Sequence, residues 1–237
     1  MALASLWRRF SKQGLDILFP AKCVGCGREG SFLCPACRGA LPRLLPPYCQ
    51  RCGVPLVSPD ASVCPRCRHS TFALDGLRSP FIMDGVIREA IHRLKYNNLK
   101  AMAPELSQLL GDYLRTSPLP AQTIVPVPLH PKRERERGYN QAALLARGLG
   151  RELGRPVVED CLRRVKDSPP QARAGSAAER QRRVAGAFVS TGTQLQGIQV
   201  LLIDDVSTTG ATMYACAQAL KQGGAASVWG LALAREP

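Results

Sequence analysis

The chain has 237 residues, of which 45% are hydrophobic, so it is long enough for one α/β domain and a small additional module. Its formal net charge is +14, from 32 Lys and Arg against 18 Asp and Glu. A surface this basic attracts nucleic acid, anionic lipid or phosphate-rich ligands, although a general excess of arginine would give the same composition. The sequence has no apolar stretch long enough to cross a bilayer, which argues against a transmembrane protein.

The cysteine pattern argues against a secreted disulfide framework. Residues 1–20 contain no uninterrupted apolar segment of the kind found in signal peptides. The first eight of the ten cysteines form CxxC pairs, a spacing typical of thiolate metal ligands. We therefore expect a cytoplasmic protein in a reducing compartment.

Apolar residues recur at roughly helical spacing through Leu3–Phe19, with Arg8, Arg9 and Lys12 between them. This pattern predicts an amphipathic helix within residues 1–20. Such a helix can lie on a membrane surface. It can also pack on its own protein, and we prefer that interpretation because helices of soluble proteins show the same pattern.

Residues 21–70 are rich in cysteine and predict a zinc-ribbon module. Two CxxC turns complete a tetrahedral shell of sulfur ligands, so eight cysteines suit two structural zinc sites. Sequential use of the pairs closes the shorter loops and is favoured, although the spacing also allows an interleaved arrangement. An iron–sulfur cluster or redox-active pairs are less favoured alternatives. The pairs are Cys23/Cys26, Cys34/Cys37, Cys49/Cys52 and Cys64/Cys67.

The module is poor in large apolar residues, so zinc is expected to replace a missing core. A contact with nucleic acid is a second hypothesis, because arginines within or beside the module could meet a phosphate backbone. These arginines are Arg28, Arg38, Arg43, Arg51, Arg66 and Arg68. The two remaining cysteines, Cys161 and Cys216, are expected to be small core residues.

After a connector at Thr71–Ser79, alternating helices and strands predict a second domain over residues 80–237. This alternation predicts a parallel sheet flanked by helices. A basic loop is expected at His130–Asn140 and a polar segment at Ser168–Ala185. The expected helices are Phe81–Tyr96, Pro104–Leu114, Gln141–Leu153 and Met213–Gln222. The expected strands are Thr123–Leu129, Val157–Val165, Ala187–Ser190, Val200–Ile203 and Ser227–Ala234.

The strand at Val200–Ile203 is followed by a pattern suited to phosphate. Asp204 and Asp205 stand at its carboxyl end, where parallel α/β folds bind ligands, and can accept hydrogen bonds from two ribose hydroxyls or from a hydrated Mg²⁺. Hydroxyl groups and free N–H groups before a helix can surround a phosphate. An acidic strand end with a simple helix cap would explain one Thr of this loop, but not the whole ordered set. The loop consists of Val206, Ser207, Thr208, Thr209, Gly210, Ala211 and Thr212.

An apolar run, two acids and a TTGxT-like loop resemble the motif of type I phosphoribosyltransferases that binds phosphoribosyl pyrophosphate (PRPP). The resemblance implies that Asp204 and Asp205 hold the ribose 2- and 3-hydroxyls and that Val206–Thr212 holds the 5-phosphate. It places pyrophosphate, with Mg²⁺, at the loop after the earlier strand.

From near Leu15 to its end, the chain resembles the ComF/GntX family. Several spaced segments match in the same order, and the family often has Asn where this chain has Arg183. The resemblance implies a type I phosphoribosyltransferase-like domain, preceded by a double zinc ribbon, in a protein of natural competence or DNA use. The matching segments are LDILFPAKCVGCG, the later CxxC pairs, LKY at Leu94–Tyr96, VPVPLHPKRERERGYNQ at Val125–Gln141, SPPQ at Ser168–Gln171, ER at Glu179–Arg180, GAF at Gly186–Phe188 and DDVSTTGAT.

With this resemblance, the basic segment gains an expected role near pyrophosphate. Arg133 and Arg137 are expected to pair with phosphate oxygens, because guanidinium groups bind them in a bidentate manner. Alternating Glu and Arg would otherwise indicate only a solvated helix start.

Two functions remain open at this stage. In the first, the protein is a phosphoribosyltransferase of nucleotide salvage or synthesis with an unknown acceptor, in which Asp204, Asp205 and Arg137 are the catalytic candidates. In the second, which we favour as the biological role, it binds PRPP with Mg²⁺ and handles incoming single-stranded DNA, with other competence proteins at the inner membrane as further partners.

Overall fold

The computed structural model describes residues 20–69, 73–96, 99–166, 184 and 186–237. The helix expected at Leu3–Phe19 lies outside these residues. Most of the polar segment Ser168–Ala185, including Arg183, also lies outside them.

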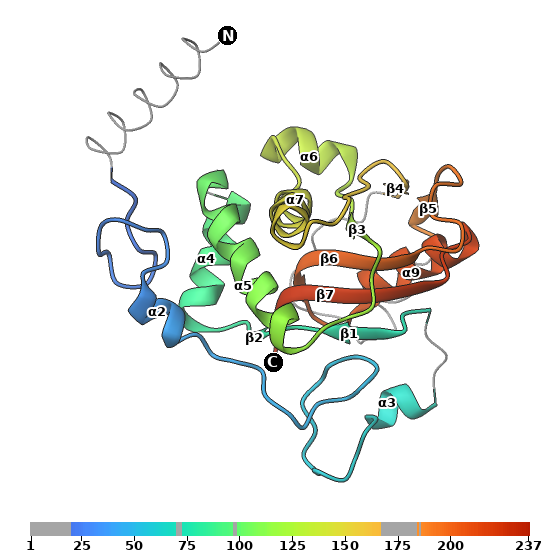
Figure 1. Cartoon of the computed structure of the whole chain (residues 1–237), viewed down its shortest axis with the longest axis horizontal. Helices are drawn as coiled ribbons and strands as arrows, with labels where there is room; N and C mark the ends of the chain where they lie inside the picture. Colours follow the sequence, from blue (N-terminus) through green and yellow to red (C-terminus); the bar gives the residue numbers. More distant parts are fainter. Residues whose placement is uncertain (1–19, 70–72, 97–98, 167–183, 185) are drawn as a thin grey trace.

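A parallel sheet forms the centre of the larger domain (Figure 1). Its strands are ordered β1 (Gly76–Arg78), β7 (Ser227–Arg235), β6 (Gln199–Ser207) and β3 (Thr123–Pro126), and β2 (Phe81–Ile82) also pairs with β7. Every pairing in this sheet is parallel. The predicted parallel α/β architecture is therefore confirmed.

Helices cover both faces of the sheet and create two apolar cores. Side chains alternate along β6, so Leu201 and Ile203 face one core, whereas Val200 and Leu202 face the other. The first core is built from α4 (Gly85–Tyr96), α5 (Ala103–Thr116), which follows the 3₁₀ turn Lys100–Met102, and α7 (Gln141–Leu153). The second core is built around α9 (Ala211–Gln222).

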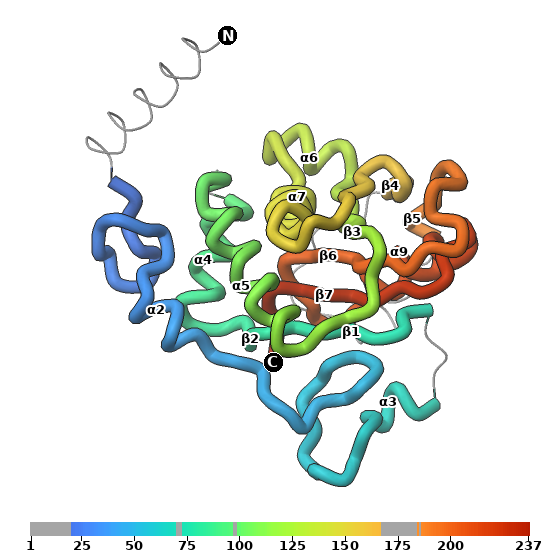
Figure 2. Tube along the Cα trace, viewed as in Figure 1, coloured from blue at the N-terminus to red at the C-terminus, as the bar shows by residue number. Residues whose placement is uncertain are grey.

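The cysteine-rich module packs against the domain in two separate places (Figure 2). Its first half, with the short helix α2 (Pro35–Gly39), contributes Val24, Leu33 and Leu41 to the core of α4, α5 and α7. Its second half, with α3 (Pro65–Arg68), contributes Cys49, Cys52, Cys64 and Cys67 to the core around α9. Each half thus buries its apolar side chains against the domain, as expected for a segment with few large apolar residues.

The basic segment His130–Asn140 is a helix rather than the loop we predicted. Helix α6 spans Pro131–Arg137. Pro131 occupies its first turn, where the missing N–H is not needed, and the His130 side chain accepts a hydrogen bond from the backbone N–H of Lys132. Gly138 ends the helix with φ of 76°, in the left-handed region. These capping signals outweigh the lack of an apolar face.

Two further predictions are corrected by strand pairing. The expected connector Thr71–Ser79 contains β1, which pairs with Trp229–Leu231 of β7. The strand expected at Val157–Val165 is split. Val157 forms a single parallel bridge with Ile124, whereas β4 (Leu162–Arg164) pairs antiparallel with β5 (Phe188–Ser190) in a separate small sheet.

Several boundaries also differ from prediction. The helix expected from Phe81 begins at Gly85, because Phe81 and Ile82 pair with β7. The strand expected at Thr123–Leu129 ends at Pro126. Pairing with β7 extends β6 to Ser207, and α9 begins at Ala211 rather than at Met213. The expected phosphate loop therefore reduces to Thr208–Gly210, with Val206 and Ser207 in the strand and Ala211 and Thr212 in the helix.

Candidate phosphate site and metal centres

Two adjacent acids stand near the carboxyl end of the central strand β6. Asp205 is 3% exposed, whereas Asp204 is half-buried. Asp205 forms an ion pair with Lys95 of α4, with 2.8 Å between Lys95 Nζ and Asp205 Oδ2. Asp204 Oδ1 accepts a hydrogen bond from the backbone N–H of Asp205 at 2.9 Å. Lys95 therefore pairs directly with Asp205 and compensates the charge of Asp204 only from a greater distance.

The two carboxyl groups differ in their electrostatic environment. Burial raises the pKa of Asp204 well above its ordinary value, and the neighbouring Asp205 carboxylate raises it further. Burial also raises the pKa of Asp205, but Lys95 and hydrogen bonds from Asp204 and Gln141 outweigh it, so the net shift is downward. Asp205 is therefore the charged partner of Lys95, and Asp204 is the acid whose charge is poorly compensated.

A polar chain connects these acids to the basic helix α6. Gln141, in the first turn of α7, lies beside Asp205 and accepts a hydrogen bond from Arg137 Nη1 at 2.5 Å. The Arg137 guanidinium carbon also lies 5.4 Å from the centre of the Tyr96 ring. Arg133 precedes Arg137 by one helical turn, so the two share a face of α6. The structure thus brings Arg137 toward Asp205 through Gln141.

The loop Thr208–Gly210 joins the acids to the amino end of α9. Gly210 has φ of 77° and is the N-cap residue of this helix. A side chain there would meet Leu77 and Tyr214 at 3.0 Å, so both conformation and space favour glycine. The Thr209 Oγ1 atom accepts a hydrogen bond from the Ala211 N–H at 3.4 Å. Backbone N–H groups at the start of an α-helix have no partner within the helix, so this end can receive an anion.

Lys95 is a residue of the site that the sequence does not assign to it. Its segment, Leu94–Tyr96, stands out in the sequence only as a matching LKY motif. Lysine on an amphipathic helix normally indicates a solvated face, and only the packing of α4 against the sheet places Lys95 beside Asp205. The matching motif was the signal available in the sequence.

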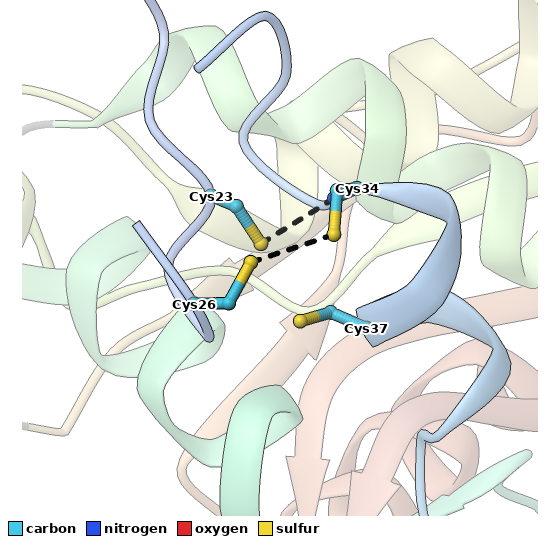
Figure 3. Close-up of side chains that lie close together, drawn as sticks. All are labelled: Cys23, Cys26, Cys34 and Cys37. Atoms are coloured by element: carbon cyan, nitrogen blue, oxygen red, sulfur yellow. Dashed lines mark hydrogen bonds between the residues drawn. The ribbon is translucent and has the colours of Figure 1, made fainter. Parts of the chain in front are cut away.

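Cysteines of the module gather into two groups of four, and within each group all Sγ atoms lie within 4.8 Å of one another. The groups are Cys23, Cys26, Cys34 and Cys37, and Cys49, Cys52, Cys64 and Cys67. The sequential arrangement is thereby confirmed and the interleaved one is excluded. Figure 3 shows the first group, whose side chains converge on a common centre.

The geometry of both groups fits zinc. The Sγ atoms of Cys26 and Cys34 are 3.6 Å apart, and those of Cys52 and Cys64 are 3.7 Å apart. Four sulfur atoms about 2.3 Å from a tetrahedral zinc ion are separated by about 3.8 Å. Backbone N–H groups of Cys34 and Cys64 donate to the Sγ atoms of Cys23 and Cys49 at 3.4 and 3.3 Å. Burial raises the pKa of each acceptor thiol, but these donors, together with neighbouring backbone N–H groups and a second cysteine, outweigh it and lower the pKa to about 6.

Three of the module arginines hold the fold together. Arg38 pairs with Asp112 of α5, Arg51 donates to the Cys67 carbonyl oxygen, and Arg66 donates to the Thr209 carbonyl oxygen. The other three, Arg28, Arg43 and Arg68, are exposed, as are Arg51 and Arg66, whereas Arg38 is half-buried. The predicted lone cysteines Cys161 and Cys216 are both buried, as expected for core residues.

Within the described part of the chain, none of the helices combines the length and apolar character needed to span a membrane.

The structure defines a class of protein in which a parallel α/β domain with an acidic strand end is joined to a module with two four-cysteine sites. The double zinc ribbon domain family matches residues 14–68. Competence protein F of Haemophilus influenzae is 32% identical over 231 residues, covering 91% of this chain and 98% of that protein. DNA utilization protein YhgH of Salmonella typhi is 32% identical over 201 residues, covering 83% of this chain and 87% of that protein. The chain belongs to the family of ComF and YhgH proteins.

Two solved structures with a similar fold have phosphoribosyl compounds or phosphoribosyl transfer in their names. Glutamine phosphoribosylpyrophosphate amidotransferase from B. subtilis has a TM-score of 0.37 and 20% identity, covering 54% of this chain and 25% of that one. Adenine phosphoribosyltransferase from Saccharomyces cerevisiae has a TM-score of 0.37 and 15% identity, covering 58% and 69%.

We predict that Cys67→Ser lowers zinc content from about two ions per chain to about one, because a shell that has lost one thiolate binds zinc far more weakly. Cys216→Ser is the matched control, since Cys216 is equally buried but belongs to neither group. Zinc is measured by release to a chromogenic chelator after denaturation. Equal zinc content in the two variants would contradict the assignment.

The two acids are expected to respond in opposite ways to removal of their charge. Asp204→Asn should stabilise the ligand-free protein by about 1 kcal/mol at neutral pH, because a poorly compensated buried charge is lost. Asp205→Asn should destabilise it by about 2 kcal/mol, since Lys95 is left without its partner. Urea unfolding measures both free energies.

The pH dependence follows from the directions of the pKa shifts. The pKa of Asp205 is lowered, so its contribution to stability is present above its ordinary pKa and is lost as pH falls through its folded value. The pKa of Asp204 is raised, so its destabilising charge disappears as pH falls through that higher value. Asp204→Asn should therefore remove the gain in stability on mild acidification. If both variants changed the pH dependence of the free energy of unfolding equally, the two acids would have equivalent electrostatic environments.

Proposed function

We propose that this protein binds PRPP with Mg²⁺ at the carboxyl end of β6 and takes part in the uptake or use of external single-stranded DNA. One observation carries the ligand proposal: two adjacent acids are followed at once by a hydroxyl-bearing loop at the amino end of α9. These parts match the ribose hydroxyls and the 5-phosphate of a phosphoribosyl group in chemistry and in order.

Each acid has a distinct expected role in binding. Lys95 forms its ion pair with Asp205 rather than with Asp204, so Asp204 suits a ribose hydroxyl or a water molecule bound to Mg²⁺. Asp205 is anchored by Lys95 and holds the strand end in position. Ser207, Thr208, Thr209 and Thr212 supply hydroxyl groups, and the Gly210 and Ala211 backbone supplies N–H donors.

The basic helix α6 is proposed to face the pyrophosphate group. Arg137 is already directed toward the acids by Gln141, and Arg133 shares its face. Two guanidinium groups near the loop after β3 would compensate pyrophosphate charge and, if transfer occurs, stabilise the leaving group.

The biological part of the proposal rests on relatives and on charge. Relatives that cover most of this chain are named for competence and for DNA utilization. A net charge of +14 suits contact with a polyanion. Phe, Trp and Tyr make up only 5% of residues, so we propose contact mainly with the phosphate backbone. DNA entering a cell is met in the cytoplasm at the inner membrane, which is the proposed location, with other competence proteins as partners.

Titration calorimetry with PRPP and Mg²⁺ tests the ligand site. We expect binding, and we expect Asp204→Asn to weaken it about tenfold or more, because a hydrogen bond to a charged acceptor is lost. Asp60→Asn is the control, since it makes the same change in an exposed loop of the cysteine module. No binding of PRPP by the unmodified protein would refute the proposal. Release of pyrophosphate with a base, amine or single-stranded DNA as acceptor would establish the transferase alternative.

Salt titration of single-stranded DNA binding tests the DNA proposal. The affinity should fall steeply as salt rises, with a slope of about −0.7 per phosphate contact. Lys132→Ala with Arg135→Ala, both exposed on α6, removes two contacts and should reduce the magnitude of this slope by about 1.4. Arg151→Ala with Arg155→Ala makes the same charge change near the far end of α7 and should leave the slope unchanged. No binding at low salt would eliminate this part of the proposal.

A further inference from the structure

A hydrogen bond joins the second cysteine site to the phosphate loop. Arg66 lies on α3 between Cys64 and Cys67, and its Nη2 atom donates to the backbone carbonyl oxygen of Thr209 at 2.9 Å. These residues are 143 positions apart in the sequence. A residue flanked by two metal-ligand cysteines thus contacts the backbone of the candidate phosphate site.

This hydrogen bond fixes the orientation of one peptide group. The peptide between Thr209 and Gly210 is trans, and in a trans peptide the C=O and the following N–H point in opposite directions. Because Arg66 holds the Thr209 carbonyl on the side of the cysteine module, the Gly210 N–H points to the other side of the loop. The peptide then presents a donor to an anion there, and its carbonyl oxygen does not oppose the negative charge.

The same region of the module is packed firmly against the strands that carry the loop. Arg235 Nη1 donates to the Cys52 carbonyl oxygen at 2.8 Å, and Arg235 lies opposite Ser207 in the sheet. The second cysteine group shares its apolar core with Leu77 and Tyr214, the two residues against which Gly210 packs. Arg66 is therefore held on a fixed support.

The first cysteine site provides an internal comparison. Its second ligand pair reads CPAC, with Ala36 at the position that Arg66 occupies in CPRC. That half of the module contacts α5, where the Phe32 N–H donates to Glu105 Oε1 at 3.0 Å and Arg38 pairs with Asp112. An arginine between the two cysteines is therefore not required to assemble a four-cysteine group.

We infer that Arg66 is a positioning residue for the phosphate loop and that the second cysteine site is a structural part of the ligand site. The effect of Arg66 on the order of the loop can be tested without a ligand. Its effect on the affinity for PRPP rests on the proposed function.

The experiment compares Arg66→Ala with Arg68→Ala in the full chain. Arg66→Ala turns CPRC into the CPAC already used by the first site, so both variants should keep about two zinc ions per chain. Arg68 is an exposed arginine on the same short helix and controls for the loss of charge. Backbone ¹⁵N relaxation gives the order parameter of the Gly210 N–H, and calorimetry gives the affinity for PRPP with Mg²⁺.

In Arg66→Ala, we expect the Gly210 order parameter to fall from about 0.85 toward 0.6. We also expect the affinity for PRPP to fall about tenfold, as for the loss of one hydrogen bond to a charged group. Arg68→Ala should change neither quantity. An unchanged order parameter in Arg66→Ala, or an equal fall in both variants, would overturn the inference. If the order parameter falls but the unmodified protein binds no PRPP, the positioning of the loop is supported and the proposed function fails.

Discussion

The ion pair between Lys95 and Asp205 is the interaction around which this site is arranged. Strand β6 lies between β3 and β7, so acids near its end are largely removed from water. A buried carboxylate without a partner is costly, and α4 supplies Lys95 to only one of the two acids. Asp204 is left with incomplete compensation. A largely buried carboxyl group with incomplete charge compensation contributes little to the stability of the protein. We therefore expect Asp204 to take part in binding a ligand.

The helix positions predicted from the sequence agree best with the structure where capping residues next to the helix determine its ends. Helix α7 spans Gln141–Leu153 as predicted, because Asn140 caps its start and Gly154 ends it. Helix α6 was missed although its caps are equally clear, because its residues carry no apolar periodicity and the prediction relied on that pattern. Strand β1 was missed for a different reason. Its pairing with β7 depends on residues about 150 positions away in the chain, and a short segment around Leu77 gives no local sign of this.

The candidate site shows the same division between local and distant information. Asp204, Asp205 and the hydroxyl-bearing loop follow one another directly, and the cysteine pairs recur at fixed spacing, so the sequence alone indicated all of them. The residues that set their electrostatic state come from elsewhere. Lys95, Gln141 and Arg66 belong to three different helices and approach the acids or the loop only through tertiary packing. Sequence patterns therefore indicated the groups that we propose to contact a ligand, but not the groups that hold those groups in place.

The two cysteine sites share a ligand set but differ in what they support. The first joins the core beneath α4 and α5, and its Cys26 is exposed. The second is wholly buried in the core around α9, where its ligands lie beside residues that pack against the phosphate loop. Because Gly210 is bounded by Leu77 and Tyr214 from that same core, distortion of the second site would reach the loop directly. Distortion of the first would reach the site through α4, which carries Lys95, and through α5. The loop Thr208–Gly210 is therefore in closer contact with the second cysteine site, whereas the ion pair of Asp205 lies on the helix that packs against the first.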